Sequence, residues 1–365
     1  MTDTIETQML DALELFHYAS QFRDHQFILV LEDDVSLEEI MLDIRMLYSA
    51  QIKIVILYSV NQKVGDYLDC WSKRGFRLHH SASKTPEQAL DLLLKEPDCV
   101  AGAVVGLDLT LCQQPEALTS QSLLIAKKMG VDKVFFLGTQ KGLTLDEKFL
   151  SHPRPSELER YLDQGRSLNI VPSKLRLMVE TTQRTGIEVI ILAGKSGTLF
   201  EEVFTHRGSG TLLTEDYPNV IRQGSDSDLT DLLMLIKHGM EQGSILPVAE
   251  EAIATNIHNY FVYTVNNSIV ASATLVDYGD TAELAKFCTL PRYQGKGRAR
   301  QLALQMIETA AELKKDSVFA LSVNPKMWDF FLGLGFDETS RGELPELWQT
   351  QYDFSRPSKA FMRRL

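Results

Sequence analysis

From residue 27 the chain alternates short β-rich runs with longer segments of helical periodicity. The alternation begins with four segments: Phe27 to Leu31, Leu37 to Tyr48, Ile52 to Tyr58 and Gly65 to Lys73. It returns in six more: Val100 to Val105, Leu118 to Met129, Lys133 to Leu137, Pro155 to Gln164, Leu175 to Thr185 and Val189 to Leu192. Alternating strands and helices pack most simply as parallel strands covered by helices, so the pattern predicts an α/β domain with a mostly parallel sheet.

A chain of 365 residues exceeds one ordinary domain, so we expect two. The pattern of alternating strands and helices changes near Asn219, where a short β-rich run precedes a Ser/Asp cluster. That cluster is suited to cap a helix over Asp228 to Gln242. We therefore place the boundary at Tyr217–Pro218, which gives domains over residues 1–217 and 218–365.

The charge balance excludes several classes of partner. Against 37 Lys and Arg stand 49 Asp and Glu, a formal net charge of -12 that would repel nucleic acid and anionic membrane surfaces alike. The four cysteines show no CxxC spacing and no nearby His pattern, so we expect neither a disulfide framework nor a metal site. No apolar run approaches a membrane span, and a reducing cytoplasm is the expected location.

The sharpest local signal is a strand, a glycine loop and a helix in succession. The run Ala285 to Leu290 leads into a loop in which Gln294, Gly297 and Ala299 form a QxxGxA pattern. Small residues there let backbone amides at a helix start approach a pyrophosphate. Four nearby cations also favour a polyanionic ligand: Arg292, Lys296, Arg298 and Arg300. The plainer alternative is a glycine-rich turn with solvated charges.

With these residues, positions 219 to 365 resemble the GNAT superfamily of N-acetyltransferases. The resemblance implies an α/β fold in which two central strands splay apart and the pantetheine of acetyl-CoA lies in the gap. A backbone amide within Phe287 to Thr289 would stabilise the oxyanion. The residues expected to bind the cosubstrate are Phe287, Cys288, Thr289, Gln294, Gly295, Lys296, Gly297, Arg298, Ala299 and Asn324.

Amine acetylation needs a base, because an ammonium group is almost fully protonated at neutral pH. Glu283 at the head of the strand is the candidate, the alternative being a solvated carboxylate. Ser322 is the candidate acid or a satisfied strand hydroxyl, since Phe331 stands where many GNAT members have a tyrosine. Asn324 either contacts pantetheine or caps a helix at Pro325. Cys288 lacks a His partner, so a core role is favoured over that of a nucleophile.

The tail Leu344-Pro-Glu-Leu-Trp-Gln-Thr-Gln-Tyr-Asp-Phe-Ser-Arg-Pro-Ser-Lys359 is similar to the ending of N-acetylglutamate synthases. This resemblance implies an amino-acid acceptor, glutamate, contacted by Arg356, Ser358 and Lys359, and a role in arginine biosynthesis. Two departures weaken glutamate as the acceptor. The family's Arg-rich stretch is replaced by residues 245–251, and Trp348 replaces a basic residue.

Residues 10 to 216 resemble a shortened amino-acid-kinase domain, an αβα sandwich that precedes the transferase in that family. Active kinases place a Lys and paired glycines after the first strand, whereas this chain has Glu32, Asp33 and Asp34. Carboxylates there repel a triphosphate, so we expect no phosphoryl transfer.

The resemblance also implies an arginine effector pocket formed by Tyr18, Glu202, Gly208 and Gly210. Alternatively, Glu202 caps local structure and the glycines only turn the chain. The leading function is an acetyl-CoA-dependent amino-acid N-acetyltransferase that forms a homo-oligomer and needs no metal. The alternative is a metabolite-sensing regulatory protein with a vestigial or protein-modifying acetyltransferase domain.

Overall fold

We describe a computed structural model of the full chain. The structure describes residues 2–32, 35–59, 62–72, 78–81, 85–95, 104–109, 115–205, 208–215, 220–265 and 268–365. The chain divides into two compact units, Met1–Glu215 and Asp216–Leu365. The boundary predicted at Tyr217–Pro218 lies outside the described residues and stays a prediction. Each unit is built on its own seven-stranded sheet.

The sheet of the N-terminal unit is parallel except at one edge. Its strands follow the order β3 (Leu78–Ser81), β4 (Val104–Asp108), β2 (Lys53–Tyr58), β1 (Gln26–Leu31), β5 (Lys133–Gly138), β8 (Glu188–Ala193) and β9 (Thr211–Leu213). Among the described strands of this sheet, only the β8–β9 pair is antiparallel. The predicted parallel sheet is therefore confirmed. A small hairpin of β6 (Thr144–Leu145) and β7 (Lys148–Phe149) stands apart.

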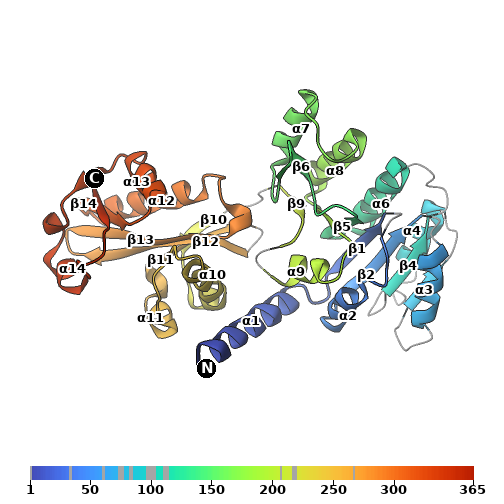
Figure 1. Ribbon diagram of the computed structural model, residues 1–365, viewed down its shortest axis with the longest axis horizontal. Helices are drawn as coiled ribbons and strands as arrows, with labels where there is room; N and C mark the ends of the chain where they lie inside the picture. Colours follow the sequence, from blue (N-terminus) through green and yellow to red (C-terminus); the bar gives the residue numbers. More distant parts are fainter. Residues whose placement is uncertain are drawn as a thin grey trace. The chain divides into compact units, whose positions relative to one another are not determined.

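Helices cover both faces of this sheet (Figure 1). One face carries α1 (Thr2–Gln21), α2 (Met41–Ser49), α3 (Gln62–Ser72) and α9 (Thr198–Phe204). The other carries α4 (Pro86–Lys95), α6 (Pro115–Met129), α7 (Pro155–Asp163) and α8 (Pro172–Thr185). Strand β1 is buried on both faces, with Phe27 and Leu29 in one core and Ile28 and Val30 in the other. This double burial explains why β1 reads as a continuous apolar run.

The strand order reverses direction beside β1. From β1 the chain moves to β2 and then to β4 on one side, and it later returns to place β5 on the other side. The carboxyl ends of β1 and β5 therefore flank a topological switch point, where open parallel sheets usually bind ligands. Glu32 follows β1 at this point, and Gly138 ends β5.

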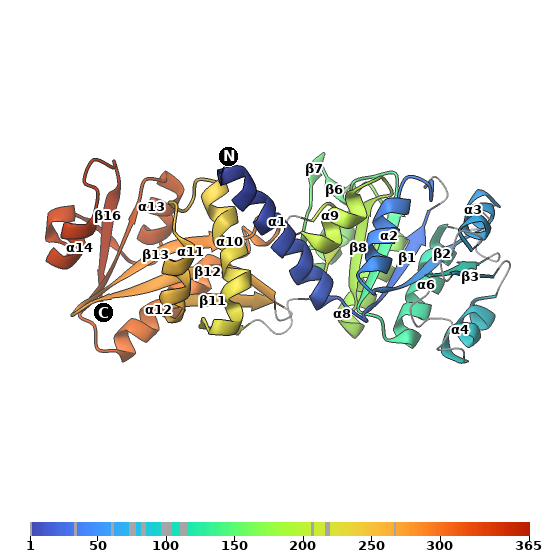
Figure 2. The same ribbon diagram turned by 90° about the horizontal axis from the view of Figure 1, so that it is seen from below.

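The sheet of the C-terminal unit is mostly antiparallel. Its order is β10 (Val220–Gln223), β11 (Tyr260–Val265), β12 (Ser268–Tyr278), β13 (Thr281–Thr289), β14 (Ser317–Ser322), β16 (Lys359–Arg364) and β15 (Asp337–Thr339). Figures 1 and 2 show its helices α10 (Leu229–Glu241), α11 (Glu250–Thr255), α12 (Arg298–Glu312) and α13 (Pro325–Leu332) around the sheet. The short helix α14 (Glu346–Gln351) precedes the last strand.

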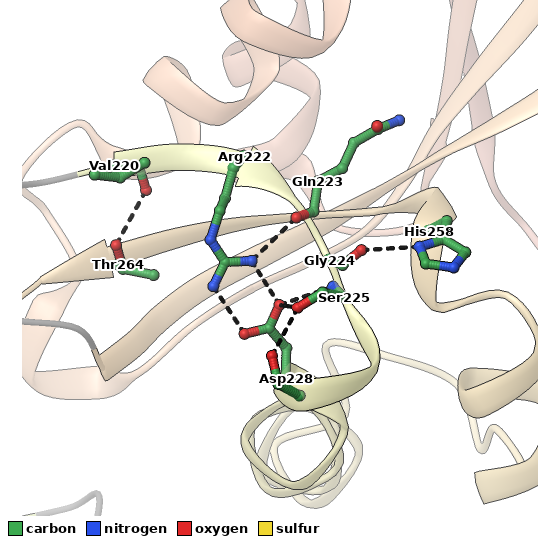
Figure 3. A network of polar contacts seen from close by, with 9 residues as sticks. Val220, Arg222, Gln223, Gly224, Ser225, Asp228, His258 and Thr264 are labelled. Carbon is green, nitrogen blue, oxygen red and sulfur yellow. Dashed lines mark hydrogen bonds and ion pairs between the residues drawn. The ribbon is translucent and has the colours of Figure 1, made fainter.

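A polar network fixes the start of α10 (Figure 3). Arg222 on β10 makes a two-pronged ion pair with Asp228, through Nη1 to Oδ2 at 2.5 Å and Nη2 to Oδ1 at 2.8 Å. The backbone N–H and hydroxyl of Ser225 also donate to Asp228, each at 2.8 Å. Ser225 and Asp228 form a capping box, but on the 3₁₀ turn η1 (Asp226–Asp228) that leads into α10, whose own N-cap makes no side-chain hydrogen bond. The predicted Ser/Asp cap is therefore present one turn earlier than expected, and it ties β10 to the start of α10.

Two predicted elements differ in their bounds. The helix expected over Leu37 to Tyr48 is α2, which begins at Met41 because a turn occupies residues 37–40. The strand expected over residues 100–105 is observed at Val104–Asp108, and residues 100–103 lie outside the described part. Helix α13 begins at Pro325, as the sequence predicted, with Asn324 as its N-cap. Within the described residues, no helix combines the length and apolar character needed to cross a membrane.

Candidate active site

The site is built where strands β13 and β14 part. The two strands pair in parallel at three positions, the last of which joins Glu283 to Phe319. Beyond this point β13 continues to Thr289 and β14 to Ser322 without further pairing between them in the described register. An opening between parallel strands exposes backbone groups to which an extended ligand can hydrogen-bond as an added strand does.

A β-bulge lies just beyond the parting point. The register between β12 and β13 shifts so that Ser272 faces Cys288 while Thr274 faces Ala285, which leaves Lys286 and Phe287 opposite the single Ala273. Lys286 has a φ of 51°, a conformation that is unfavourable for residues other than glycine. Bulges redirect the backbone next to active sites. Here the bulge precedes the segment Phe287 to Thr289, from which we predicted the oxyanion amide.

The glycine loop follows β13 and leads directly into α12. Gly295 and Gly297 have φ angles of 75° and 79°, and Gly297 is the N-cap of the helix. The side-chain Nε2 of Gln294 donates to the backbone carbonyl of Thr289 at 2.9 Å and so ties the loop to the strand end. The strand, loop and helix therefore bring the predicted cosubstrate residues together, with free space where a Cβ of either glycine would stand.

Two of the four cations near the loop donate to backbone carbonyls of the protein. The Arg298 side chain is buried, donates to the carbonyl of Tyr293 at 2.9 Å and lies over the Tyr293 and Tyr263 rings. Arg300 is exposed and donates to the carbonyl of Gly333 at 3.0 Å. The cationic count of the sequence therefore overstates the charge that faces a ligand by at least the buried Arg298. A ligand contact at Arg298 would use its backbone amide.

Glu283 is held by two aromatic donors at the parting point. The Trp348 indole and the Tyr278 hydroxyl hydrogen-bond to its carboxylate, and the positive charge of Lys286 lies nearby. Burial is the larger effect and raises the pKa of Glu283 above its ordinary value of 4.5. The same burial and the Glu283 charge raise the pKa of Tyr278 to about 12, so its hydroxyl stays protonated. A carboxylate with a raised pKa is a better general base near neutral pH.

The other candidate groups on β14 have defined partners. The Ser322 hydroxyl accepts the backbone N–H of Asn324 at 3.1 Å, and its own proton remains available to a ligand. The Asn324 side chain accepts the N–H of Lys326 at 3.0 Å, so the helix-cap alternative is the one observed. The Trp328 indole donates to the Ser322 carbonyl at 2.8 Å and fixes the strand end.

Cys288 lies on the core side of β13. Its thiol donates to the carbonyl of Leu235 at 3.2 Å, and burial raises its pKa to about 12. A thiolate nucleophile needs a depressed pKa, so this thiol is unsuited to form an acetyl-enzyme. The structure agrees with the core role favoured from the sequence, and leaves the Cys288 backbone as its contribution to the site.

Residues 228–336 match the acetyltransferase (GNAT) family. The C-terminal unit is a GNAT acetyltransferase domain. The parting strands, the bulge and the glycine loop lie within the matched residues or beside them, and the sequence-based prediction of an acetyltransferase is confirmed. Among the described residues, no group of three or more His, Cys, Asp and Glu side chains is arranged to hold a metal ion.

The likeness to known proteins extends beyond this domain. The chain is similar to the amino-acid acetyltransferase of Pseudomonas fluorescens (strain Pf0-1), with 28% identity over 300 residues covering 80% of this chain and 68% of the relative. The enzyme of the same name from Pseudomonas putida (strain GB-1) is 26% identical over 302 residues, with the same two coverages. The chain is therefore homologous to amino-acid acetyltransferases over most of its length.

A solved structure shows the same two-part fold. N-acetylglutamate synthase from Neisseria gonorrhoeae, complexed with coenzyme A and L-arginine, matches with a TM-score of 0.59 and 19% identity. The match covers 96% of this chain and 98% of that chain. The predicted fold class, an amino-acid-kinase-like unit followed by a GNAT domain, is confirmed.

Two of the predicted acceptor residues, Arg356 and Ser358, contact Tyr352, whose ring stacks on the Trp348 that bonds to Glu283. The Arg356 guanidinium lies 5.9 Å from the centre of the Tyr352 ring, which stacks on Trp348 at 4.3 Å. Ser358 shares a 2.6 Å hydrogen bond with the Tyr352 hydroxyl. Lys359 pairs with Glu338 at 2.8 Å and lies 4.8 Å from the centre of the Trp328 ring. Of these three side chains, that of Arg356 is the least committed to contacts within the protein.

In the N-terminal unit, Glu202 holds the glycine turn that follows α9. Its carboxylate accepts the backbone N–H of Ser209 at 2.7 Å and of Gly210 at 2.9 Å. A Cβ on Gly210 would lie 2.4 Å from the carbonyl oxygen of Ile191, so only glycine fits there. Gly208 has a φ of 59°. The predicted capping role of Glu202 is therefore present.

The helices that carry two of the predicted effector residues pack against each other. Helix α1 packs against α9, which brings the element bearing Tyr18 beside the element bearing Glu202. Tyr18 stacks on Phe22 within the core of this unit. Of the three acids that replace the kinase motif, Glu32 is described and Asp33 and Asp34 lie outside the described residues. Their predicted effects on nucleotide binding stay predictions.

Three features of the GNAT domain were not found from the sequence. Tyr278 ends the strand before β13, and its hydroxyl reaches Glu283 only because the β12–β13 hairpin returns beside it. The sequence shows that Trp348 replaces a basic residue of the resembling family, but not that its indole bonds to Glu283, because the two residues lie on elements far apart in the chain. Lys286 carries no local signal, since glycine is the residue expected at its φ.

Proposed function

We propose that this protein transfers the acetyl group of acetyl-CoA to the α-amino group of an amino acid, with glutamate as the leading acceptor. The observation that supports this most is Glu283, a carboxylate with a raised pKa, at the last paired position before β13 and β14 part. The glycine loop and the N-terminus of α12 lie at the other end of the same strand. Base and cosubstrate cradle therefore share one strand.

The proposed reaction is a direct attack of the amine on the thioester that acetyl-CoA supplies. Glu283 accepts the proton of the acceptor's ammonium group, directly or through a water, and frees the lone pair. A backbone N–H within Phe287 to Thr289 stabilises the negative charge that develops on the carbonyl oxygen. The C–N bond forms and the C–S bond breaks. Ser322 donates its proton to the departing sulfur and regains one from the acetylated nitrogen, directly or through a water, while the proton held by Glu283 returns to solvent.

The acceptor's carboxylate is assigned to Arg356. A guanidinium can bind a carboxylate through two parallel hydrogen bonds, and the Tyr352 ring supports the Arg356 side chain from one side. Lys359 and Ser358 have partners of their own, Glu338 and Tyr352. They would contact the acceptor only by sharing these partners. The names of the relatives favour an amino acid as acceptor, and that of the matching solved structure, an N-acetylglutamate synthase, favours glutamate.

The decisive experiment is mass spectrometry of the full-length protein with acetyl-CoA and a panel of amino acids. We expect one acetyl group added to glutamate, with other amino acids acetylated more slowly. Calorimetry with acetyl-CoA is the companion measurement. Cosubstrate binding without acetylation of any amino acid would exclude the proposed acceptor class, and absence of cosubstrate binding would exclude the enzyme altogether.

We also propose that the N-terminal unit senses arginine. The matching synthase is complexed with L-arginine, and here Glu202, Gly208 and Gly210 form a compact turn at the end of α9. The test is the rate of acetylation against arginine concentration in Glu202→Ala, with Glu201→Ala on the same helix as the matched control. Loss of the arginine response in both variants would count against a specific role of Glu202. The homo-oligomer and the cytoplasmic location stay predictions.

A further inference from the structure

The N-terminal unit contains a cavity at the topological switch point of its sheet. The cavity has a volume of about 190 Å³ and lies between the carboxyl ends of β1 and β5 and the start of α8. Its polar walls include Glu32, Thr139, Gln140 and Lys174. It belongs to neither the GNAT site nor the turn held by Glu202, because those residues are absent from its walls.

A charged pair is the main feature of the cavity. Lys174 on α8 forms an ion pair with Glu32 at the end of β1. Only 8% of Lys174 is exposed, whereas the Glu32 side chain is 39% exposed. The pair uses Nζ of Lys174 and Oε1 of Glu32. An ammonium group has three donors and a carboxylate has two oxygens, so both partners retain capacity to bind a further ligand without separating.

The backbone around this pair is shaped to keep the cavity open. A Cβ on Gly138 would lie 2.6 Å from Oε2 of Glu32, so glycine is what allows this oxygen to lie against the end of β5. The following loop is fixed by Asn169, whose amide donates to the carbonyl of Gly142 at 2.8 Å and accepts the N–H of Thr144 at 2.6 Å. The cavity is therefore a built feature with a rigid rim.

The charges of the pair restrict the ligand. A polyphosphate would meet the exposed Glu32 carboxylate, and a simple cation would meet the Lys174 ammonium at short range. A zwitterion meets both groups favourably and leaves the net charge of the cavity unchanged. Burial of Lys174 strengthens this preference, since separating a buried ion pair without replacing its partners is costly.

Size and apolar lining narrow the class further. Sites for drug-sized ligands usually measure about 300 Å³ or more, so the cavity is too small for a nucleoside triphosphate. The remaining wall is largely apolar and includes Phe136, Leu143 and Met178. We propose that this cavity binds a free amino acid with an uncharged side chain, whose carboxylate contacts Lys174 and whose ammonium group contacts Glu32.

Hydrogen–deuterium exchange measured by mass spectrometry on the full chain tests the proposal, because it locates protection in the sequence. The probes are the common L-amino acids at millimolar concentration, each with its amide or ester and its deaminated acid. We expect one or more amino acids with uncharged side chains to slow exchange in residues 136–145 and 168–178. The amide, the ester and the acid each lack one charge and should not protect.

The variant Glu32→Gln should raise the amino-acid concentration that gives half-maximal protection at least tenfold. Lys133→Met is the matched control, because it removes the lysine of another Lys–Glu ion pair. Lys133 and its partner Glu188 lie at the amino ends of β5 and β8, at the other edge of the sheet from the cavity. A second variant, Val171→Trp, places a bulky ring at an exposed wall position and should block binding while leaving both charges in place.

Protection should persist in Arg356→Ala, which separates this cavity from the acceptor site. Three results would overturn the proposal: no protection by any amino acid, equal protection in Glu32→Gln, and protection by ATP in place of amino acids. If Glu32→Gln fails to fold, Val171→Trp decides the question alone, since unchanged protection there would exclude the cavity.

Discussion

Trp348 donates its indole N–H to the carboxylate of Glu283, the residue at which β13 and β14 part. The ring is buried, stacks on Tyr352 at 4.3 Å and meets Phe319 edge-on at 5.9 Å. A basic side chain at this position would place a full charge beside the base and lower its pKa. An indole fixes the orientation of the carboxylate with a dipole alone, so burial still dominates and the pKa remains raised.

Replacing Trp348 by Phe should therefore raise the pKa of Glu283 further. Phe keeps most of the ring packing but removes the donor that favours the ionised carboxylate. Because the ionised form acts as base, the acidic limb of the kcat profile should move to higher pH. The measurement is kcat against pH at saturating substrates. Trp328→Phe is the control, since its indole donates to the Ser322 carbonyl; an equal shift there would refute the specific link to Glu283.

Glu283→Gln should separate chemistry from cosubstrate binding. Glutamine keeps the size and the hydrogen bonding of the side chain but cannot accept the ammonium proton, so turnover should fall by roughly 10²-fold or more. Acetyl-CoA affinity, measured by calorimetry, should stay nearly unchanged. Glu312→Gln at the exposed end of α12 is the control. Turnover near that of the unmodified protein at neutral pH would remove Glu283 from the mechanism.

Some of the site follows from the sequence because its signals are local. The pattern formed by Gln294, Gly297 and Ala299 is confined to one loop, and the structure places that loop between β13 and α12. The Ser225 and Asp228 cap and the Asn324 cap are equally local, since each acts within a few residues. Short-range backbone needs of this kind restrict residue type strongly enough to be recognised.

The contacts that tune the site join distant parts of the chain and leave no such signal. The pair of Lys174 and Glu32 spans 142 residues, and the bond from Trp348 to Glu283 depends on how α14 packs against the sheet. Arg298 shows the converse error, because a basic residue in a phosphate-type loop proved to be buried beneath two tyrosine rings. Sequence alone records the charge of a side chain but not the direction in which it points.

Arg356→Ala should raise the KM for the acceptor while leaving that for acetyl-CoA unchanged. The loss of a charge-assisted contact to a carboxylate corresponds to roughly 10- to 100-fold in KM. Steady-state kinetics with glutamate and with its α-amide will test the assignment, since an acceptor without the α-carboxylate should be insensitive to the change. The exposed Arg364 on β16 supplies the control variant Arg364→Ala. An unchanged KM would place the acceptor carboxylate elsewhere.

The Arg222–Asp228 pair should make the GNAT domain lose stability in acid. Hydrogen bonds from Arg222 lower the pKa of Asp228 from 3.8 to about 2. Between these pH values the unfolded chain binds more protons at this position than the folded chain does. The stabilisation is therefore complete above pH of about 4 and is lost as the pH falls toward 2. Since the Arg222 side chain is 42% exposed, solvent screening limits the effect to about 1 kcal/mol.

Asp228→Asn removes this titration but keeps a side chain that can cap α10. Urea unfolding, followed by a probe in the C-terminal unit at a series of pH values, should show lower stability than the unmodified protein at neutral pH. The difference should shrink as the pH falls toward 2, because protonation then removes the ion pair from the unmodified protein as well. Asp226→Asn, at an exposed carboxylate in the same turn, should leave the pH dependence unchanged. A constant difference across this pH range would show that Asp228 acts through packing alone, without the charge that Arg222 binds.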